Sequence, residues 1–257
     1  GVMSGSGTSS THDHQHTHDH GHDHGHRRTM QRHCEVAIIG GSAAGLAAGL
    51  QLARQRRSVV VVDDVTPRNA PAEHMHGYLG REGASPAELV AVGREEVRSY
   101  GGEVLTGRVL GARRLEDGSF QLDLSGGHTL VARRVVAATG VVDELPEIEG
   151  LAEQWGRGVV HCPFCHGYEV RDQRLVMIVA QPFGLHAAPV WRHLSDRLTV
   201  VLHTDLGPDV ERDSIAPLEA AGVRVVHGPV RRVVEAPGGS VAGVEMVSGE
   251  VLAADAV

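Results

Sequence analysis

Two of the chain's three cysteines lie three residues apart in the segment HCPFCHGYE, residues 161–169. Cys162 and Cys165 have the spacing of a small disulfide that closes readily, and His166 follows the second cysteine directly. A neighbouring imidazolium or a helix N-terminus lowers the pKa of a thiol, and the thiolate is the form that attacks disulfides. The segment therefore favours a thiol-disulfide redox couple.

Three other interpretations of this pair remain open. The pattern C-x-x-C-H is also the spacing of a c-type haem attachment, which requires export and an axial ligand elsewhere. A zinc site needs two further ligands, and the sequence has no second C-x-x-C, although His161 and His166 flank the pair. The pair could also be buried and inert. Cys34, just before the first expected strand, is interpreted as a small buried hydrophobic residue rather than a third redox centre.

The overall composition is that of a soluble enzyme. Among 257 residues, 41% are apolar and 22% are charged, so one or two ordinary domains are expected. Aromatic residues make up 3% and the net charge is -8, which argues against a nucleic-acid partner. No apolar run reaches the length of a membrane span, and the N-terminus lacks the apolar core of a signal peptide. These features predict a cytoplasmic protein without a membrane partner.

Residues 1–32 differ from the rest of the chain. The segment is small and polar, with histidine at every second position from His12 to His26. It cannot build a core, so a disordered His-rich tail is expected. Such a tail either sequesters zinc, nickel or copper or is a leader with incidental metal affinity. We favour the second interpretation and assign no metal ligand.

A strand-turn-helix-strand unit is expected to position the first candidate site. Strand 36–39, helix 43–55 and strand 59–62 form a βαβ unit around a Gly-rich turn. Gly40 and Gly45 occupy the first and third positions of G-x-G-x-x-G, and Ser42 replaces the middle glycine. Small residues let a dinucleotide pyrophosphate approach the helix N-terminus. Asp63, at the end of the second strand, is placed to accept hydrogen bonds from ribose hydroxyls.

Further elements complete two α/β units. A helix is expected to start at Ser85, with Pro86 in its first turn and a capping box to Glu88, and to end at Gly101. An antiparallel meander is expected between residues 104 and 139, followed by a buried strand that ends at Gly140. The second unit is expected to contain strands 175–179, 198–203 and 223–226, and helices 186–194 and 215–221. The chain stops inside another apparent strand, VLAADAV, so we expect it to be a fragment.

Several of these motifs, in this order, resemble the thioredoxin-reductase-like branch of the FAD-dependent pyridine nucleotide-disulfide oxidoreductases. They are IIGGSAAGLAAG, PRN at 67–69, HMHGYLG at 74–80, AATG at 137–140 and HCPFCHGYE. The resemblance spans roughly residues 35–257. It implies an α/β fold of two Rossmann-like three-layer domains, with FAD as the cofactor. The implied cofactor-binding residues are Gly40, Gly41, Ser42, Ala44, Gly45, Asp63, Asn69, Thr139 and Gly140.

The resemblance also implies roles for the redox residues. In thioredoxin-reductase-like enzymes the second cysteine lies against the flavin and the first exchanges with substrate, which maps to Cys165 and Cys162 here. Thioredoxin reductases usually carry an acidic proton carrier after the second cysteine. Here the position holds His166, and the segment HGYE that it begins resembles the dithiol oxidases that close disulfides in holomycin- and gliotoxin-type products. His166 is accordingly expected to take a thiol proton, with a hydrogen-bonded structural role as the alternative.

The second unit lacks the Gly-rich turn that NADPH phosphates require. Ala180, Gln181 and Pro182 follow the strand, and the proline removes an N–H donor. The segment after the next strand carries acids where a 2′-phosphate calls for arginines. We therefore expect a dithiol, from a small molecule or a protein, to reduce the Cys162–Cys165 disulfide, and oxygen to reoxidise the flavin. The alternatives are an NAD(P)H-dependent reductase of the same fold and a metal-buffering protein with a degenerate flavin domain.

These inferences define an expected organisation. Residues 1–32 are the tail, residues 33–152 the FAD-binding domain without its C-terminal return segment, and residues 153–257 a second Rossmann-like domain with the cysteine pair. The resemblance implies a homodimer for the full-length protein. We expect the 257-residue chain alone to hold FAD weakly or not at all.

Overall fold

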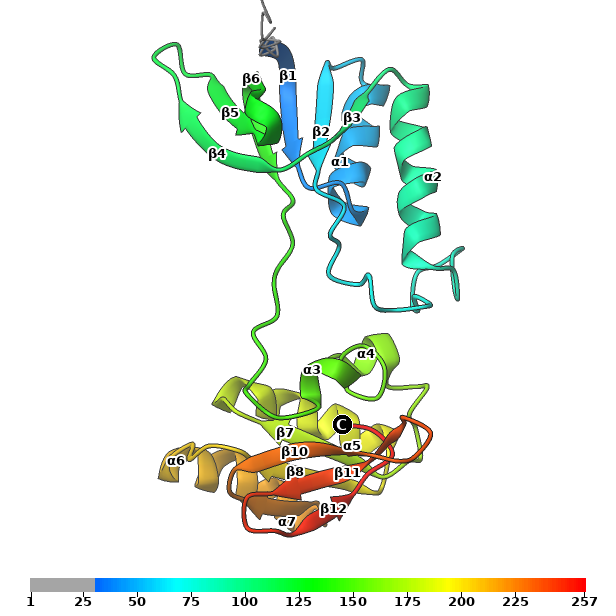
Figure 1. Cartoon of the computed structure of the whole chain (residues 1–257), viewed down its shortest axis with the longest axis vertical. Helices are drawn as coiled ribbons and strands as arrows, with labels where there is room; N and C mark the ends of the chain where they lie inside the picture. Colours follow the sequence, from blue (N-terminus) through cyan, green and yellow to red (C-terminus); the bar gives the residue numbers. More distant parts are fainter. Residues whose placement is uncertain (1–30) are drawn as a thin grey trace, which may run out of the picture.

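The structure is a computed structural model that describes residues 31–257, which form two lobes joined by an extended linker (Figure 1). The first lobe holds a six-stranded sheet in the order β3-β2-β1-β6-β5-β4. Its strands are β1 (Gln31–Ile39), β2 (Val59–Asp63), β3 (Glu103–Thr106), β4 (Val109–Arg114), β5 (Phe120–Leu124) and β6 (Thr129–Ala137). β1, β2, β3 and β6 run parallel, whereas β4 and β5 form the expected antiparallel meander.

Two helices of the first lobe, α1 (Ala43–Arg54) and α2 (Pro86–Ser99), pack against each other beside the sheet (Figure 1). The Ser85 hydroxyl accepts a hydrogen bond from the Glu88 N–H at 3.1 Å, which confirms the expected cap of α2. One hydrophobic cluster joins α1 to β1 and β2. A second cluster joins the other face of β1 and β2 to Leu122, Leu124 and Leu130 of the meander. The alternation of apolar side chains along the strands therefore produces three layers.

The second lobe combines two three-stranded sheets. β7 (Leu175–Val179), β8 (Leu198–Leu202) and β9 (Arg224–His227) are parallel, and β10 (Val230–Glu235), β11 (Val241–Met246) and β12 (Val251–Ala253) are antiparallel. Its helical segments are α3 (Leu151–Gln154), α4 (Pro163–His166), η2 (Pro182–Ala187), α5 (Ala188–Leu194), α6 (Pro208–Val210), η3 (Glu211–Ile215) and α7 (Ala216–Ala220). α5 and α7 share a hydrophobic cluster with the parallel strands.

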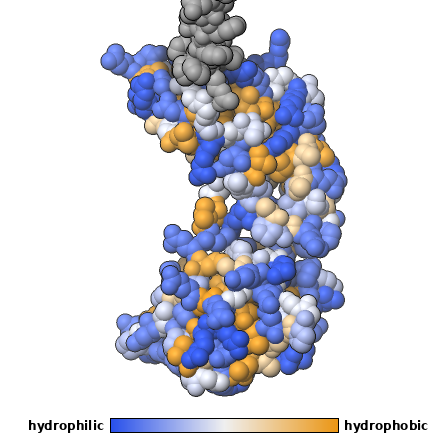
Figure 2. Space-filling view, in the orientation of Figure 1, coloured by the Kyte–Doolittle hydropathy of each residue, from blue (hydrophilic) through white to orange (hydrophobic). Residues whose placement is uncertain are grey.

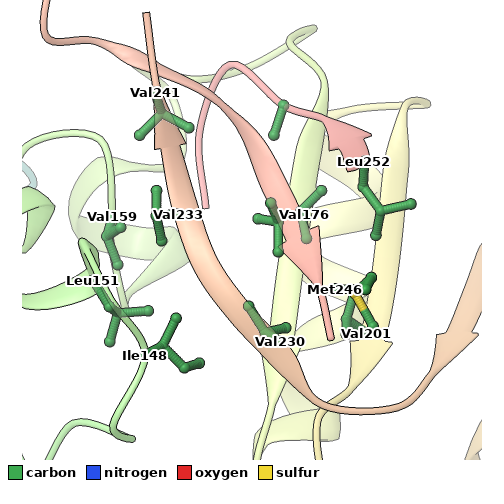
Figure 3. Close-up of a cluster of buried hydrophobic side chains, with 12 residues drawn as sticks. Ile148, Leu151, Val159, Val176, Val201, Val230, Val233, Val241, Met246 and Leu252 are labelled. Carbon is green, nitrogen blue, oxygen red and sulfur yellow. The ribbon is translucent and has the colours of Figure 1, made fainter. Parts of the chain in front are cut away.

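The two sheets of the second lobe pack face to face. Val230, Val233 and Met246 of the antiparallel sheet contact Val176 and Val201 of the parallel sheet in one buried cluster (Figure 3). This sandwich plus its helices again gives three layers, so the expected α/β class of two Rossmann-like lobes is confirmed. Sequence analysis did not predict β10 and β11, although the GG turn at 238–239 separates two valine-rich segments there.

Some expected boundaries differ from the structure. β1 begins at Gln31, so residues 31 and 32, expected in the tail, pair with β6 instead. The rest of the His-rich segment lies outside the described residues. Ile148 and Leu151 pack in the core of the second lobe. The chain therefore enters that lobe a few residues before residue 153, where the second domain was expected to begin. The expected helix 186–194 is divided between η2 and α5, and Pro189, which has no N–H to continue the hydrogen-bond ladder, lies in the first turn of α5.

Candidate active site

The turn between β1 and α1 has the geometry of a phosphate cradle. Gly40 has a φ of +104°, and a Cβ on it would overlap the carbonyl oxygen of Ala138. A Cβ on Gly45 would overlap the Gly40 carbonyl oxygen, so only glycine lets α1 start this close to the strand. The Ser42 side chain makes no capping hydrogen bond, which leaves the first N–H groups of the helix available to an anion.

Asp63 supports this turn from the end of β2. Its Oδ1 accepts the Gly41 N–H at 3.2 Å, and its other oxygen pairs with the Arg94 guanidinium from α2. The side chain is only 12% exposed. Asp63 therefore ties the β1–α1 turn to α2, and both carboxylate oxygens already have a partner within the protein. Its expected contact with a ribose stays a prediction.

The remaining expected cofactor residues lie at the same edge of the first lobe. Thr139 and Gly140 lie just beyond the end of β6, after Ala138, and Asn69 lies in the long loop after β2; all three are exposed. Ala44 is exposed in the first turn of α1. Because β1, β2 and β6 are parallel, their carboxyl ends share one edge, and this edge faces the second lobe (Figure 1). The structure thus brings the predicted residues together, and together they fit a dinucleotide.

The cysteine pair forms a disulfide at the start of α4. Cys162 and Cys165 have Cα atoms 5.3 Å apart and are disulfide-bonded. The Cys162 carbonyl accepts the N–H groups of Cys165 and His166 at 3.2 and 3.1 Å, so the turn holds both cysteines in place. Within residues 31–257, no group of three or more His, Cys, Asp or Glu side chains is arranged to hold a metal. A disulfide is what the redox-couple interpretation expects, and neither a haem attachment nor a zinc site contains one.

A cavity between the lobes connects the two candidate regions. Its volume is about 220 Å³, and Asn69 of the first lobe and Cys165 and His166 of the second lie in its wall. The space-filling view shows the recess between the lobes (Figure 2). The Nδ1 atom of His166 is buried and has no hydrogen-bond partner among residues 31–257. An orphaned imidazole nitrogen at a cavity that also contains the second cysteine fits a cofactor or substrate atom that completes its bonding.

Ion pairs across the cavity were not predicted from the sequence. Arg68 donates two hydrogen bonds to Asp143 in the linker, at 2.5 and 2.7 Å, and lowers the pKa of that carboxyl. His76 lies 2.7 Å from Glu82 and 3.5 Å from Glu169 of the second lobe. The hydrogen bond to Glu82 is the main reason why the pKa of His76 is raised. The His76–Glu169 pair joins the loop that follows β2 to the segment just after α4, and the Arg68–Asp143 pair joins the same loop to the linker.

His161 also borders the cavity. Its ring stacks on Trp155 with 5.4 Å between ring centroids. Burial is the main cause of its lowered pKa, and the charge of Arg68 acts in the same direction. His161 therefore lies beside the disulfide as a weakly basic imidazole. The sequence indicated this residue only as a poor zinc ligand.

The corresponding turn of the second lobe has no phosphate cradle. η2 follows β7 and begins with Pro182, which has no N–H to donate. The Gly184 N–H is already bonded to the Gln181 carbonyl at 3.0 Å. α5 has only seven residues, and its N-cap, Ala187, carries no capping side chain. In this turn Pro182 therefore has no donor to offer a phosphate, and the donor of Gly184 is already used.

A Rossmann-like lobe with an open helix N-terminus faces a lobe that carries a disulfide, and this arrangement suits a bound dinucleotide beside a thiol-disulfide pair. The chain belongs to the pyridine nucleotide-disulphide oxidoreductase family, whose model matches residues 34–257. Proteins of this family are FAD-binding flavoproteins, and FAD is the cofactor. The resemblance found in the sequence motifs is confirmed.

Individual relatives support this assignment. The thioredoxin reductase tcpT of Claviceps purpurea is 36% identical over 174 residues, which cover 65% of this chain and 54% of the relative. The thioredoxin reductase aclD of Aspergillus oryzae is 33% identical over 207 residues, covering 74% and 65%. The chain thus spans between about half and two thirds of the length of these relatives.

Solved structures show the same arrangement. The crystal structure of HlmI has a TM-score of 0.80 and 42% sequence identity, and the match covers 87% of this chain and 70% of that one. A putative thioredoxin reductase TrxB from Bacillus anthracis has a TM-score of 0.79 and 28% identity, and the match covers 86% of this chain and 74% of that one.

Among residues 31–257, no helix has both the length and the apolar character needed to cross a membrane.

Proposed function

We propose that this protein is an FAD-dependent dithiol oxidase, which closes a disulfide in its substrate and transfers the electrons to molecular oxygen. The observation that carries the proposal is the difference between the two turns. The β1–α1 turn leaves backbone donors open for a dinucleotide, whereas η2 has Pro182 in place of a donor and a bonded Gly184 N–H. Because the second turn offers no site for the phosphates of a nicotinamide cofactor, electrons are proposed to reach the flavin from a dithiol through the cysteine pair.

The exchange chemistry takes place at the cysteine pair. A substrate thiolate attacks Cys162 Sγ, forms a mixed disulfide and releases the Cys165 thiolate. The second substrate thiol then attacks the substrate sulfur of the mixed disulfide, which closes the substrate disulfide and releases Cys162. Two electrons and two protons have then left the substrate. His166, next to Cys165 and with an unpartnered nitrogen, is proposed to accept a thiol proton.

Cys165 and His166 both lie in the wall of the inter-lobe cavity, which Asn69 borders from the other side. This supports Cys165 as the cysteine on the cofactor side and Cys162 as the one that exchanges with substrate. When bound, FAD would supply two-electron chemistry, accepting the electrons of the cysteine pair and passing them to oxygen, which is reduced to hydrogen peroxide. Gly40, Gly45 and the free N–H groups of α1 would hold its phosphates.

The test is the stoichiometry of oxygen uptake by the FAD-loaded, full-length protein supplied with a dithiol. We expect one oxygen consumed and one peroxide formed per substrate disulfide. Cys162→Ser should abolish uptake. Cys34→Ser is the matched control, because Cys34 lies in the first lobe and burial raises its pKa to about 11, so it should retain activity. Dithiol turnover without oxygen consumption would contradict the proposal.

The second candidate is an NAD(P)H-dependent disulfide reductase. It is favoured by the names of the curated relatives, which are called thioredoxin reductases. In that case NADPH would reduce the flavin and the cysteine pair would pass electrons outward. The two candidates differ in the direction of electron flow, which a spectrum of the flavin distinguishes.

A further inference from the structure

Two phenylalanines near the disulfide are exposed to solvent. Phe164, between the two cysteines, and Phe183, in η2, each have 81% of their surface exposed. Exposure of large apolar side chains costs free energy, and such groups near a reactive centre indicate a contact surface for a ligand. The two residues come from elements that are far apart in the sequence.

A single cavity of the second lobe joins these two residues. Pro163, Phe164 and His161 of the disulfide loop border one side of it, and Phe183 and His186 of η2 border another. The Phe183 ring packs edge-on against His186, with 5.5 Å between ring centroids and 70° between ring planes. This contact holds the exposed Phe183 ring against His186, and both residues lie in the wall of the cavity that the disulfide loop also borders.

The charge of the cavity wall limits its ligand. No arginine or lysine borders the cavity, and Glu144 is its carboxylate. A ligand with phosphates or several carboxylates would find no cation there and would meet one like charge. An uncharged, apolar group is the partner that this wall fits.

We propose that Phe183 is a specificity-determining residue, which forms with Phe164 an apolar subsite for the body of the dithiol while Cys162 exchanges with its thiols. η2 occupies the position where a nucleotide-binding lobe would hold phosphates. In this chain it supplies an aromatic wall instead. The inference rests on the proposed dithiol oxidation and adds to it the residue that selects among dithiols.

The test compares two uncharged probes with the FAD-loaded, full-length protein under anaerobic conditions. Benzene-1,2-dimethanethiol has an aromatic body, and dithiothreitol is small and polar. We expect Phe183→Ser to lower the second-order rate constant of flavin bleaching about tenfold for the aromatic probe and less than twofold for dithiothreitol. Phe183→Tyr, which keeps the ring, should retain the rate with both probes.

Leu110→Ser provides the control, because it removes an apolar side chain of 68% exposure from β4 in the first lobe. It should change neither rate. Equal loss with both probes in Phe183→Ser, or no loss with either, would overturn the subsite and leave the oxidase proposal standing. If neither dithiol bleaches the flavin of the wild-type protein, the proposed function fails and the subsite fails with it.

Discussion

Each lobe has a turn that leads from its first parallel strand into a helical segment, and the two turns differ in whether they can bind a phosphate. In the first lobe, Gly40 and Gly45 bring α1 so close to β1 that a side chain at either position would overlap a carbonyl oxygen. In the second lobe, Pro182 starts a 3₁₀ turn, and a seven-residue helix follows. The difference shows that a Rossmann-like topology survives the loss of its phosphate site, because the sheet core and not the turn holds the lobe together.

The largest effect is expected from a substitution of Gly45 in the first turn. Gly45→Ala places a Cβ on the Gly40 carbonyl oxygen, so backbone must move. We expect a loss of about 3 kcal/mol in the free energy of unfolding and at least a tenfold loss of FAD affinity. Denaturant unfolding of the full-length protein and titration of its apoprotein with FAD measure these two quantities.

Gly184→Ala is the matched control in the second turn. Its Cβ would lie 3.5 Å from Val179 Cγ1, which is an ordinary contact, and the Gly184 N–H would keep its bond to Gln181. We expect normal flavin content and a change in stability below about 0.5 kcal/mol. Equal losses in both variants would contradict the comparison.

A smaller effect is expected at the strand-end acids. Asp63→Asn removes the carboxylate that holds the Gly41 N–H and the Arg94 guanidinium, which is only 20% exposed. We expect a loss of about 2 kcal/mol in stability, because a partly buried guanidinium loses its counter-charge. Asp205→Asn, after β8, should change stability little, because Asp205 is exposed and bonds only the Gly207 N–H. Thermal unfolding measures both; a harmless Asp63→Asn would show that the turn does not depend on this carboxylate.

The pair at the start of β7 should contribute less. Hydrogen bonds from the Arg174 side chain and main chain lower the pKa of Asp255 from 3.8 to about 2. The stabilisation is therefore present above the unfolded value of 3.8 and is lost as the pH falls through about 2. Because both side chains are more than a third exposed, we expect Asp255→Asn to cost only about 0.5 kcal/mol at neutral pH. Unfolding curves from pH 7 to pH 2 should show wild type and variant converging; a constant gap would contradict the assigned pair.

The smallest effect is expected from Pro182→Gly. It restores one N–H to the second turn, but Gly184 remains bonded to Gln181 and α5 remains too short for a phosphate site. NADPH affinity, measured by titration calorimetry, should change less than twofold. Micromolar binding by the variant would mean that the proline alone had blocked the site.

Local patterns were sufficient for the first lobe. The glycines at 40 and 45, the cap at Ser85 and the meander are determined by short-range rules, and the structure has all of them. Arg68 pairs with Asp143 of the linker and His76 with Glu169 of the second lobe, and no spacing rule connects such distant residues. The exposure of Phe183 likewise depends on the packing of η2. The spacing of the two cysteines therefore predicted their disulfide, whose redox role stays a prediction, whereas the cavity beside it required the structure.

The central claim is that electrons reach the flavin from a dithiol and not from a nicotinamide. The most direct test follows the oxidised-flavin absorbance of the FAD-loaded, full-length protein without oxygen, first with NADPH and then with a dithiol. We expect an unchanged spectrum with NADPH and bleaching with the dithiol, and Cys162→Ser should lose the second response. Rapid bleaching by NADPH would instead identify the protein as a reductase and refute the dithiol oxidase.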